Sequence, residues 1–190
     1  TARYNLQLSG GTMSAEGSVE YGPKVKLVNL KRLTLDGLHA DYVHAAHTQR
    51  AEAARAKATV ETAKSINANE DVLVRVEYIG LVNGELGFVN HAAKPEYRVF
   101  LTDADLILER YSSQLRDGPA SLAIHGKFMG TGETQISGIM RAPQDAPDLE
   151  HKIKIAGTQI RSMNNLLRAY GNFDVVGGVF SCYSELTLDD

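Results

Sequence analysis

The chain has 190 residues, a formal net charge of −3 at pH 7 and a single cysteine. This length is enough for a substantial core in one domain, and the small, scattered charge argues against nucleic acid as a partner. One thiol excludes an internal disulfide and a multi-thiolate metal site, and no apolar run reaches the roughly 18 residues that a membrane-spanning helix needs.

Three short strands are predicted near the N-terminus. Apolar and polar residues alternate in residues 2–8, 19–21 and 25–29, which is the pattern of half-buried strands. Gly10-Gly11 and Gly22-Pro23 separate them, because glycine and proline interrupt regular structure. The chain is therefore expected to begin in β structure.

Residues 33–43 and 79–89 share one pattern, in which an alternating apolar strand runs into Asp36-Gly37 or Asn83-Gly84 and a second strand follows. Asp-Gly and Asn-Gly pairs accept the positive φ angles of a tight turn. Each segment is thus predicted to form a β-hairpin. Two copies of one hairpin favour a long sheet built by repetition, an architecture that suits binding or carrying better than bond-making.

Residues 45–64 differ from their surroundings, because they are rich in alanine and contain neither glycine nor proline. Alanine has the highest intrinsic helix propensity, so this stretch predicts one long helix. Its apolar face is weak, which favours a solvated excursion between strands. Contacts of Ala53, Ala56 and Val60 with an apolar strand face would instead indicate a lid over that face.

The rest of the chain is predicted to extend the sheet. Residues 72–78 alternate as a strand, and residues 97–108 alternate with a one-residue shift of parity that predicts a β-bulge near Thr102-Asp103. Further strands are predicted at residues 122–128, 134–140, 149–155 and 176–188.

A short helix is predicted at about residues 159–170, with Thr158 as its N-cap and Gly171 as its end. The predicted fold class is therefore mainly β: a strongly curved antiparallel sheet folded like a taco, with one long alanine-rich helix at about 45–64 and this short helix. Residues 1–190 are predicted to form a single elongated domain. No closing element follows the last strand, so we expect the chain to be a fragment of a longer protein.

One segment carries a family resemblance. Residues 87–106 read Gly-Phe-Val-Asn-His-Ala-Ala-Lys-Pro-Glu-Tyr-Arg-Val-Phe-Leu-Thr-Asp-Ala-Asp-Leu. This stretch resembles the central signature of bacterial AsmA-like proteins, in particular the large branch long known as a domain of unknown function. The match extends through residues 117–120, 126–130, 165–176 and 180–186, so it covers the chain from about Lys26 to the C-terminus. A Gly-Tyr-Val-Lys-Pro-Leu type segment and an N-terminal membrane anchor, both usual in that family, are not in this sequence.

The resemblance implies a location and a role. AsmA-like proteins are grouped with bridge-like lipid-transfer proteins, whose repeated β-groove units form a long trough for phospholipids. By resemblance, this chain would lie in the periplasm of a Gram-negative cell, held at the inner membrane by an anchor outside the fragment. It would be non-enzymatic and would need no cofactor. Its partners would be phospholipid acyl chains, and its role would be intermembrane lipid transport and maintenance of the outer membrane and cell envelope.

A curved sheet with one apolar face could meet this role on its own terms. Two acyl chains expose on the order of 30 methylenes, so moving them through water costs roughly 20 kcal/mol or more. An apolar trough removes most of that cost while the headgroup stays in solvent. The predicted groove-lining residues are Val74, Val76, Tyr78, Leu86, Phe88, Val99, Leu101, Leu106, Leu108, Leu122, Ile124, Phe128, Ile153, Ile155, Phe180, Leu186 and Leu188.

The same residues have a second interpretation. Alternating apolar residues also build the closed core of a β-sandwich, and the chain would then be a structural or protein-interaction domain with a filled core and no lipid path. A third hypothesis is a carbohydrate-active or esterase-like β enzyme, which would require converging carboxylates or a Ser-His contact. Whether the apolar face is open or filled separates the first two.

Residues that could hold a metal ion or perform catalysis do not form a recognisable pattern. His44 and His47 lack a third ligand placed by spacing, and Asp103 and Asp105 lack the further acidic ligands of a calcium loop. The serines of the last strand have no histidine nearby in sequence. The sequence therefore predicts no metal site, no cofactor and no catalytic residue.

Overall fold

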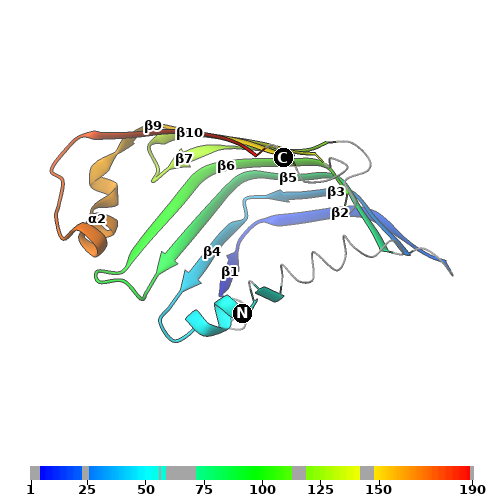
Figure 1. Cartoon of the computed structure of the whole chain (residues 1–190), viewed down its shortest axis with the longest axis horizontal. Helices are drawn as coiled ribbons and strands as arrows, with labels where there is room; N and C mark the ends of the chain where they lie inside the picture. Colours follow the sequence, from blue (N-terminus) through cyan, green and yellow to red (C-terminus); the bar gives the residue numbers. More distant parts are fainter. Residues whose placement is uncertain are drawn as a thin grey trace.

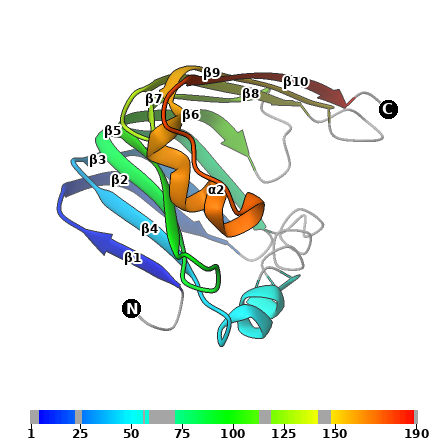
Figure 2. The same cartoon turned by 90° about the vertical axis from the view of Figure 1, so that its left-hand side faces the viewer.

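The computed structural model of the chain describes residues 5–22, 26–55, 57–58, 72–112, 119–141 and 148–188. The structure is 68% strand, so the fold is mainly β as predicted. The strands form one open, curved sheet accompanied by two short helices (Figures 1 and 2). In chain order the strands are β1 (Leu6–Ser9), β2 (Thr12–Tyr21), β3 (Lys26–Asp36), β4 (His39–His44), β5 (Val72–Asn90), β6 (Tyr97–Ser112), β7 (Ala120–Phe128), β8 (Gly132–Arg141), β9 (Asp148–Gln159) and β10 (Val179–Leu188).

Strand β5 joins the two parts of the sheet. It pairs antiparallel with β6 on one side and parallel with both β3 and β4 on the other. Strand β2 pairs with β3 and β1 pairs with β4, and from β6 to β10 each strand pairs with the next, all of them antiparallel. The sheet is therefore mixed, and the prediction of a wholly antiparallel sheet was wrong. Parallel neighbours need a long crossover connection, which residues 45–71 provide between β4 and β5.

Neither predicted hairpin forms. Asn83-Gly84 lies inside the continuous strand β5, and Asp36-Gly37 lies where β3 passes into β4 along the same side of β5. The positive φ angles that suggested turns are present, at +52° for Asn83 and +67° for Gly37. They bend strands that continue instead of reversing them. A hairpin requires its two strands to pair with each other, whereas both sides of β5 are occupied by strands from elsewhere in the chain.

Residues with positive φ line up across neighbouring strands. Gly11 lies between β1 and β2, Gly37 between β3 and β4, Asn83 in β5 and Asp103 in β6, with φ of +78°, +67°, +52° and +49°. The register of β6 against β7 shifts between Thr102 and Asp105, which confirms the predicted bulge. The strands change direction at this level, as β5 and β6 show in Figure 1. These four residues are termed the corner row.

Hydrogen bonds join the corner row from strand to strand. The amide of Gly37 donates to the Val82 carbonyl oxygen at 2.9 Å, and the amide of Glu85 donates to the Leu38 carbonyl oxygen at 2.9 Å. On the other side of β5, the amide of Asn83 donates to Asp105 Oδ1 at 3.0 Å. Backbone groups that the bends remove from the regular ladder are thus paired again, which is what a bulge inside a sheet requires.

The long alanine-rich helix at about 45–64 is not matched. Residues 46–48 form a turn and helical structure begins only at residue 49, covering residues 49–55 and 57–58; the remainder of the predicted helix lies outside the described residues. Thr48 accounts for the later start, because its amide donates to the Ala45 carbonyl oxygen at 3.0 Å and its hydroxyl oxygen accepts from the Ala45 amide at 3.3 Å, as in a Thr-stabilised turn.

The second helix is a 3₁₀ turn, η1 (Ile160–Met163), followed by α2 (Asn164–Gly171). Its extent agrees with the prediction of about 159–170. Thr158 is not its N-cap, because this residue lies in β9 with its side chain fully buried. Gly171 is its last residue, and Asn172, with φ +53°, takes the left-handed conformation that ends a helix.

A substitution at the corner row tests whether the bend stabilises the fold. A Cβ on Gly11 would lie 2.8 Å from the Asp36 carbonyl oxygen, and φ +78° disfavours any L side chain. We expect Gly11→Ala to lower the free energy of unfolding by about 2 kcal/mol. Urea titration followed by far-UV circular dichroism measures the change. Gly177→Ala is the control, because a Cβ there meets no heavy atom within 4 Å; equal losses in both variants would contradict the role of the bend.

Candidate functional site

One face of the sheet is apolar across almost all of its strands. Cross-strand partners lie on the same face, so the register assigns side chains to faces. One continuous row of partners from β2 to β9 consists of Met13, Leu35, Leu81, Leu106, Ile124, Ile136 and Ile153. This set is termed the aliphatic row. The adjacent row on the other face is mixed, with Ser14, Thr34, Gly80, Ile107, Ala123, Ser137 and Lys152.

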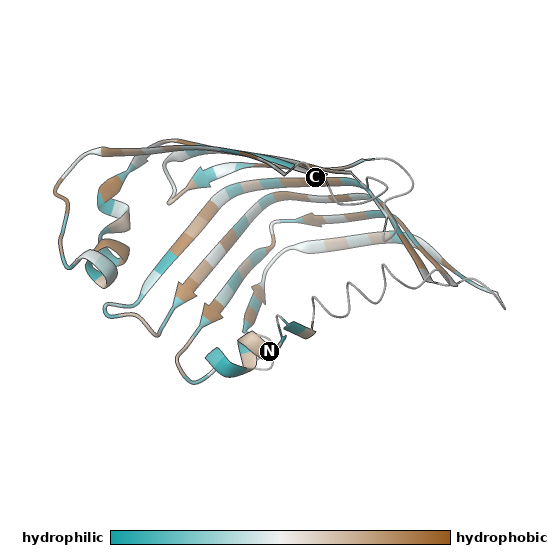
Figure 3. Cartoon of the chain, in the orientation of Figure 1, coloured by the Kyte–Doolittle hydropathy of each residue, from teal (hydrophilic) through white to brown (hydrophobic). Residues whose placement is uncertain are grey.

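The bends keep this face apolar along each strand. Leu81 and Leu86 are an odd number of residues apart and would lie on opposite faces of a regular strand. The extra residue at Asn83 restores the parity, because the register passes from Leu81 opposite Leu106 to Leu86 opposite Leu101. Figure 3 shows apolar residues recurring along the long strands on both sides of the bend.

A second set of kinks acts in the same way farther along the strands. Strand β3 has an extra residue at Lys31 relative to β2, and Arg110 in β6 has φ +56°. Val76 and Ile79 therefore share a face although an odd number separates them. Val76 pairs with Leu30 and Ile79 pairs with Leu33. These two β3 residues in turn pair with β2 residues that are two positions apart and therefore share a face.

The apolar face is the concave one. Figure 2 places α2 and the helical residues after β4 within the curve of the sheet. Both helices contact residues of the apolar face: Tyr170 of α2 contacts Tyr97 of β6, and Glu52 contacts His44 of β4. Tyr97 lies two residues from Val99 and His44 lies two residues from Tyr42, so each shares a face with that neighbour. Val99 and Tyr42 are both cross-strand partners of Phe88, which lies on the apolar face. The inside of the curve is thus lined by the apolar rows.

The described residues leave much of the concave face open. A compact monomer of 20.7 kDa exposes roughly 8,900 Å², whereas this chain exposes 12331 Å². Among the described residues, the buried hydrophobic side chains are Ala45, Val76, Leu81, Tyr97, Ala104, Ala120, Met129 and Met163. Residues of the concave face near the β1–β2 edge are the most exposed, including Met13 at 71% and Val19 at 73%. A second layer of strands does not cover this face in the described part of the chain.

The register brings most of the predicted lining residues together on the concave face. These are Val74, Val76, Leu86, Phe88, Val99, Leu101, Leu106, Leu108, Leu122, Ile124, Phe128, Ile153, Ile155, Phe180 and Leu186. Leu188 occupies the end of β10 opposite Leu149.

Tyr78 is the exception, because it lies on the convex face. Its ring would meet a Cβ on Gly80, the Arg32 guanidinium lies 4.3 Å from its ring centroid, and its register partner is Glu109. In a regular strand Tyr78 would share a face with Val76, and the alternation in the sequence predicted it there. The kink between Val76 and Ile79 reverses the alternation, so Tyr78 lies on the opposite face.

Other concave residues were not predicted. Leu33, Leu35, Ile79 and Leu81 belong to the apolar rows, but the hairpin interpretation assigned them to strands paired within each hairpin. The signal that could have found them is the same odd spacing that revealed the bulge at Asp103. Applied to Leu81 and Leu86 around Asn83-Gly84, it predicts a bent strand with one apolar face.

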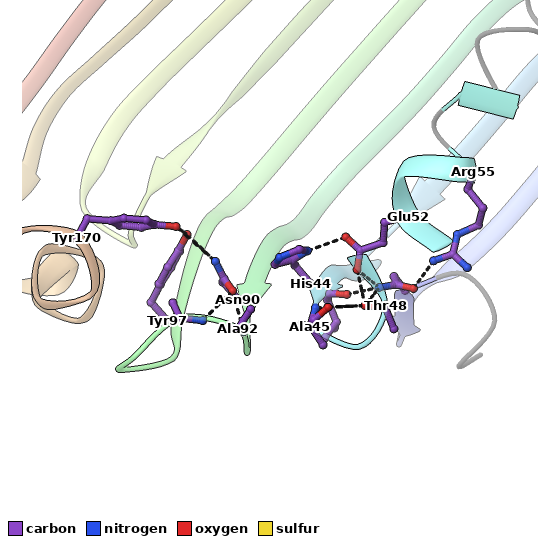
Figure 4. A network of polar contacts seen from close by, with 12 residues as sticks. His44, Ala45, Thr48, Glu52, Arg55, Asn90, Ala92, Tyr97 and Tyr170 are labelled. Carbon is purple, nitrogen blue, oxygen red and sulfur yellow. Dashed lines mark hydrogen bonds and ion pairs between the residues drawn. The ribbon is translucent and has the colours of Figure 1, made fainter. Parts of the chain in front are cut away.

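Polar side chains tie the first helix to one end of the concave face. Asn5 Nδ2 donates to Glu52 Oε1 at 2.6 Å, and Arg55 donates to Asn5 Oδ1 at 2.6 Å. Glu52 also accepts from the Thr48 hydroxyl and lies 2.6 Å from His44 Nδ1. Figure 4 shows these side chains converging beside the ends of the strands. They are termed the Glu52 cluster.

The Glu52 carboxylate is held in its charged form. Burial acts to raise the pKa of Glu52, but hydrogen bonds from Thr48 and His44 outweigh it and lower the pKa to about 2. Burial, together with the nearby Glu52 carboxylate, raises the pKa of the Tyr42 hydroxyl. All these groups satisfy one another, so the Glu52 cluster is suited to fastening the helix and not to proton transfer.

A second polar group lies beside the first, at the same strand ends (Figure 4). The Tyr97 and Tyr170 hydroxyls are 2.9 Å apart, and Asn90 Nδ2 donates to the Tyr97 hydroxyl at 3.1 Å. An aromatic series continues across the sheet, from Tyr170 to Tyr97 to Phe88 to Tyr42, with ring centroids 5.8, 6.4 and 6.0 Å apart. We term these four rings the aromatic band.

The convex face carries its own ion pairs. Arg98 lies 2.8 Å from Asp41 and 2.6 Å from Glu85 across β4, β5 and β6, above Gly87, where a Cβ would collide with Asp41. Burial acts to lower the pKa of Arg98, but hydrogen bonds to Asp41 and Glu85 outweigh it and raise that pKa. This group stabilises strand pairing at the bend.

The remaining candidates have structural partners. His44 contacts Glu52, Asp103 forms an ion pair with Lys127 at 2.8 Å, and Asp105 accepts from the Asn83 amide. Across the described ranges, no three His, Cys, Asp or Glu side chains gather where a metal ion could bind. Within those ranges, too, neither helix has the length and apolar character of a membrane span. Cys182 is exposed on the concave face opposite Ile155.

Comparisons with protein-family models, with curated proteins and with solved structures find no match to this chain.

The pKa of Glu52 predicts a pH dependence. The pKa is about 2 in the folded chain and 4.5 for an ordinary glutamate, so the stabilisation is complete above about pH 4.5 and fades as the pH falls toward 2. Glu52→Gln is expected to lower the free energy of unfolding by about 2 kcal/mol at pH 7. The Tm of this variant should also fall less than that of the wild type between pH 4.5 and pH 2. Thermal unfolding at a series of pH values measures both. Glu20→Gln, on the exposed strand β2, should follow the wild type; an unaltered pH profile in Glu52→Gln would refute the assignment.

Proposed function

We propose that this chain is a non-enzymatic β-groove segment that shields phospholipid acyl chains on the concave face of its sheet. In this proposal it works in the periplasm, carried by a longer protein anchored in the inner membrane. It contributes there to lipid transport between membranes and to maintenance of the envelope. The observation that supports the proposal most directly is a single curved layer of strands whose inner side is apolar and open.

The dimensions of the sheet suit an acyl chain. Strand β5 has 19 residues, and at about 3.3 Å per residue it spans roughly 60 Å along its path. One leaflet of a bilayer has a hydrocarbon depth of about 15 Å. The aliphatic row and the apolar rows beside it therefore extend far enough along the strands to cover the full length of an acyl chain. They also continue across the strands from β2 to β9, so successive positions along the trough are chemically alike.

The energetics favour shielding. Exposure of two acyl chains to water costs roughly 20 kcal/mol or more, and contact with leucine, isoleucine and valine removes most of this cost. Such a surface needs no nucleophile, base or metal ion. Its polar clusters, at Glu52 and Asn90, lie at one end of the strands. The register also places Thr134, His151 and Ser184 on the concave side of β8, β9 and β10.

A pair of substitutions on adjacent residues of β6 tests the proposal. Leu106 lies in the aliphatic row, whereas Ile107 lies on the convex face and is 40% exposed. We expect Leu106→Lys to reduce the phospholipid that co-purifies with the chain at least severalfold, because a lysine would place a charge against acyl chains. Ile107→Lys should leave it unchanged. Mass spectrometry of organic extracts measures the lipid, and Phe88→Asp provides a second substitution of the concave face.

Thermal unfolding of the same variants completes the test. Leu106→Lys should keep a cooperative transition within a few degrees of the wild type. If it unfolds the chain, Leu106 belongs to a closed core and the proposal loses its support. Equal lipid loss in Ile107→Lys would also count against it, because the effect would then not depend on which face is changed.

A further inference from the structure

The concave face changes character along the strands. Its centre, at the aliphatic row from β2 to β9, is apolar. At the helix end it carries the aromatic band, and with it the hydroxyls of Tyr97 and Tyr170 and the amide of Asn90. Tyrosine has an apolar ring and a polar tip, so it concentrates where an apolar region meets water. The aromatic band therefore marks a wet boundary along one edge of the apolar surface.

The same edge is positively charged. It is formed by residues 44–55 and 57–58, by the β5–β6 loop at residues 91–96, and by η1, α2 and the residues after them to 174 (Figure 1). The described residues of these segments include the cations Arg50, Arg55, Lys57, Lys94, Arg161 and Arg168, against the anions Glu52, Glu96 and Asp174. This edge is termed the helix rim. Its excess of positive charge contrasts with the net charge of −3 for the whole chain.

The opposite ends of the strands lack this excess among the described residues. There the charged side chains on β2, β3, β5, β6 and β9 are Lys31, Arg32, Arg75 and Arg110, against Glu16, Glu20, Glu77, Glu109 and Glu150. Tyrosine–tyrosine hydroxyl pairs and an aromatic series like those at the helix rim are not found among the described residues of this end. The helix rim is therefore the more positively charged of the two rims, and it is the one that carries the aromatic band.

We propose that a phospholipid with an anionic headgroup binds in one orientation, its headgroup at the helix rim and its acyl chains along the strands toward the aliphatic row. This inference rests on the proposed function, and it adds the charge class of the lipid and the rim that receives its headgroup. The phosphate lies beside the cations of the helix rim, the ester region lies against the aromatic band, and the chain ends point along the strands toward Leu106 and Ile124.

Tryptophan reporters test the orientation, because the chain contains no tryptophan. Val99→Trp places a reporter beside the aromatic band and Ile124→Trp places one in the aliphatic row. Each variant is mixed with phosphatidylglycerol brominated either near the carbonyl end or near the methyl end of an acyl chain. We expect the carbonyl-end bromine to quench Val99→Trp more strongly, and the methyl-end bromine to quench Ile124→Trp more strongly.

The outcomes separate the two proposals. The reverse order of quenching, or equal quenching of both reporters by both lipids, would overturn the orientation while leaving acyl-chain shielding intact. Absence of quenching at both positions, in variants that retain the wild-type circular dichroism spectrum, would overturn the proposed function and this inference with it.

Charge substitutions test the headgroup. Arg50→Gln combined with Lys57→Gln removes two exposed cations of the helix rim. We expect retention of phosphatidylglycerol relative to phosphatidylcholine to fall roughly threefold to tenfold, since exposed charge pairs are individually weak and two are removed together. Lys152→Gln combined with Lys154→Gln, on the convex face, is the matched control and should keep the wild-type ratio. An unchanged ratio in the rim variant, or an equal fall in the control, would refute the choice of rim.

Discussion

The structure depends on bends that neighbouring strands make at the same level. At the corner row, Gly11, Gly37, Asn83 and Asp103 each adopt positive φ, and hydrogen bonds between strands replace the ladder bonds that the bends remove. A bend in one strand alone would break its pairing with the next. Because each bend also adds a residue, the alternation of side chains is reset and the same face stays apolar on both sides.

This constraint explains how a single sheet can be curved and still present a continuous hydrocarbon surface. A straight strand as long as β5 would present a flat apolar face, whereas the bent strand makes that face concave. Few side chains are fully buried in the described part of the chain, and those nearest the bend, Leu81 and Ala104, are supported by the sheet itself. The described residues of the two helices contact the sheet at one end of the strands, through Glu52 and Tyr170.

The asymmetry between the two rims gives this architecture a direction. The side chains of the Glu52 cluster are paired with one another, as are Asn90, Tyr97 and Tyr170, so these groups can border an apolar region. The Glu52 carboxylate keeps its charge there because hydrogen bonds outweigh the effect of burial. A trough with one wet, cationic edge and a hydrocarbon centre matches the amphipathic form of a phospholipid more closely than it matches a uniform apolar peptide. The chemistry of the surface, more than any single residue, supports the function proposed for it.

The sequence by itself determined the mainly β class, the short second helix, the bulge near Thr102-Asp103 and most of the residues that share the apolar face, since alternation and local propensity are properties of neighbouring residues. Only the tertiary structure decided that Asn83-Gly84 bends a continuous strand, that β3 and β4 run parallel to β5, and that Tyr78 faces outward. A positive φ angle has the same local signature in a turn and in a bulge, and which of the two forms depends on whether the strand's partners are adjacent or distant. The Glu52 cluster was likewise invisible in sequence, because Asn5 reaches Glu52 only after the sheet has brought β1 beside β4.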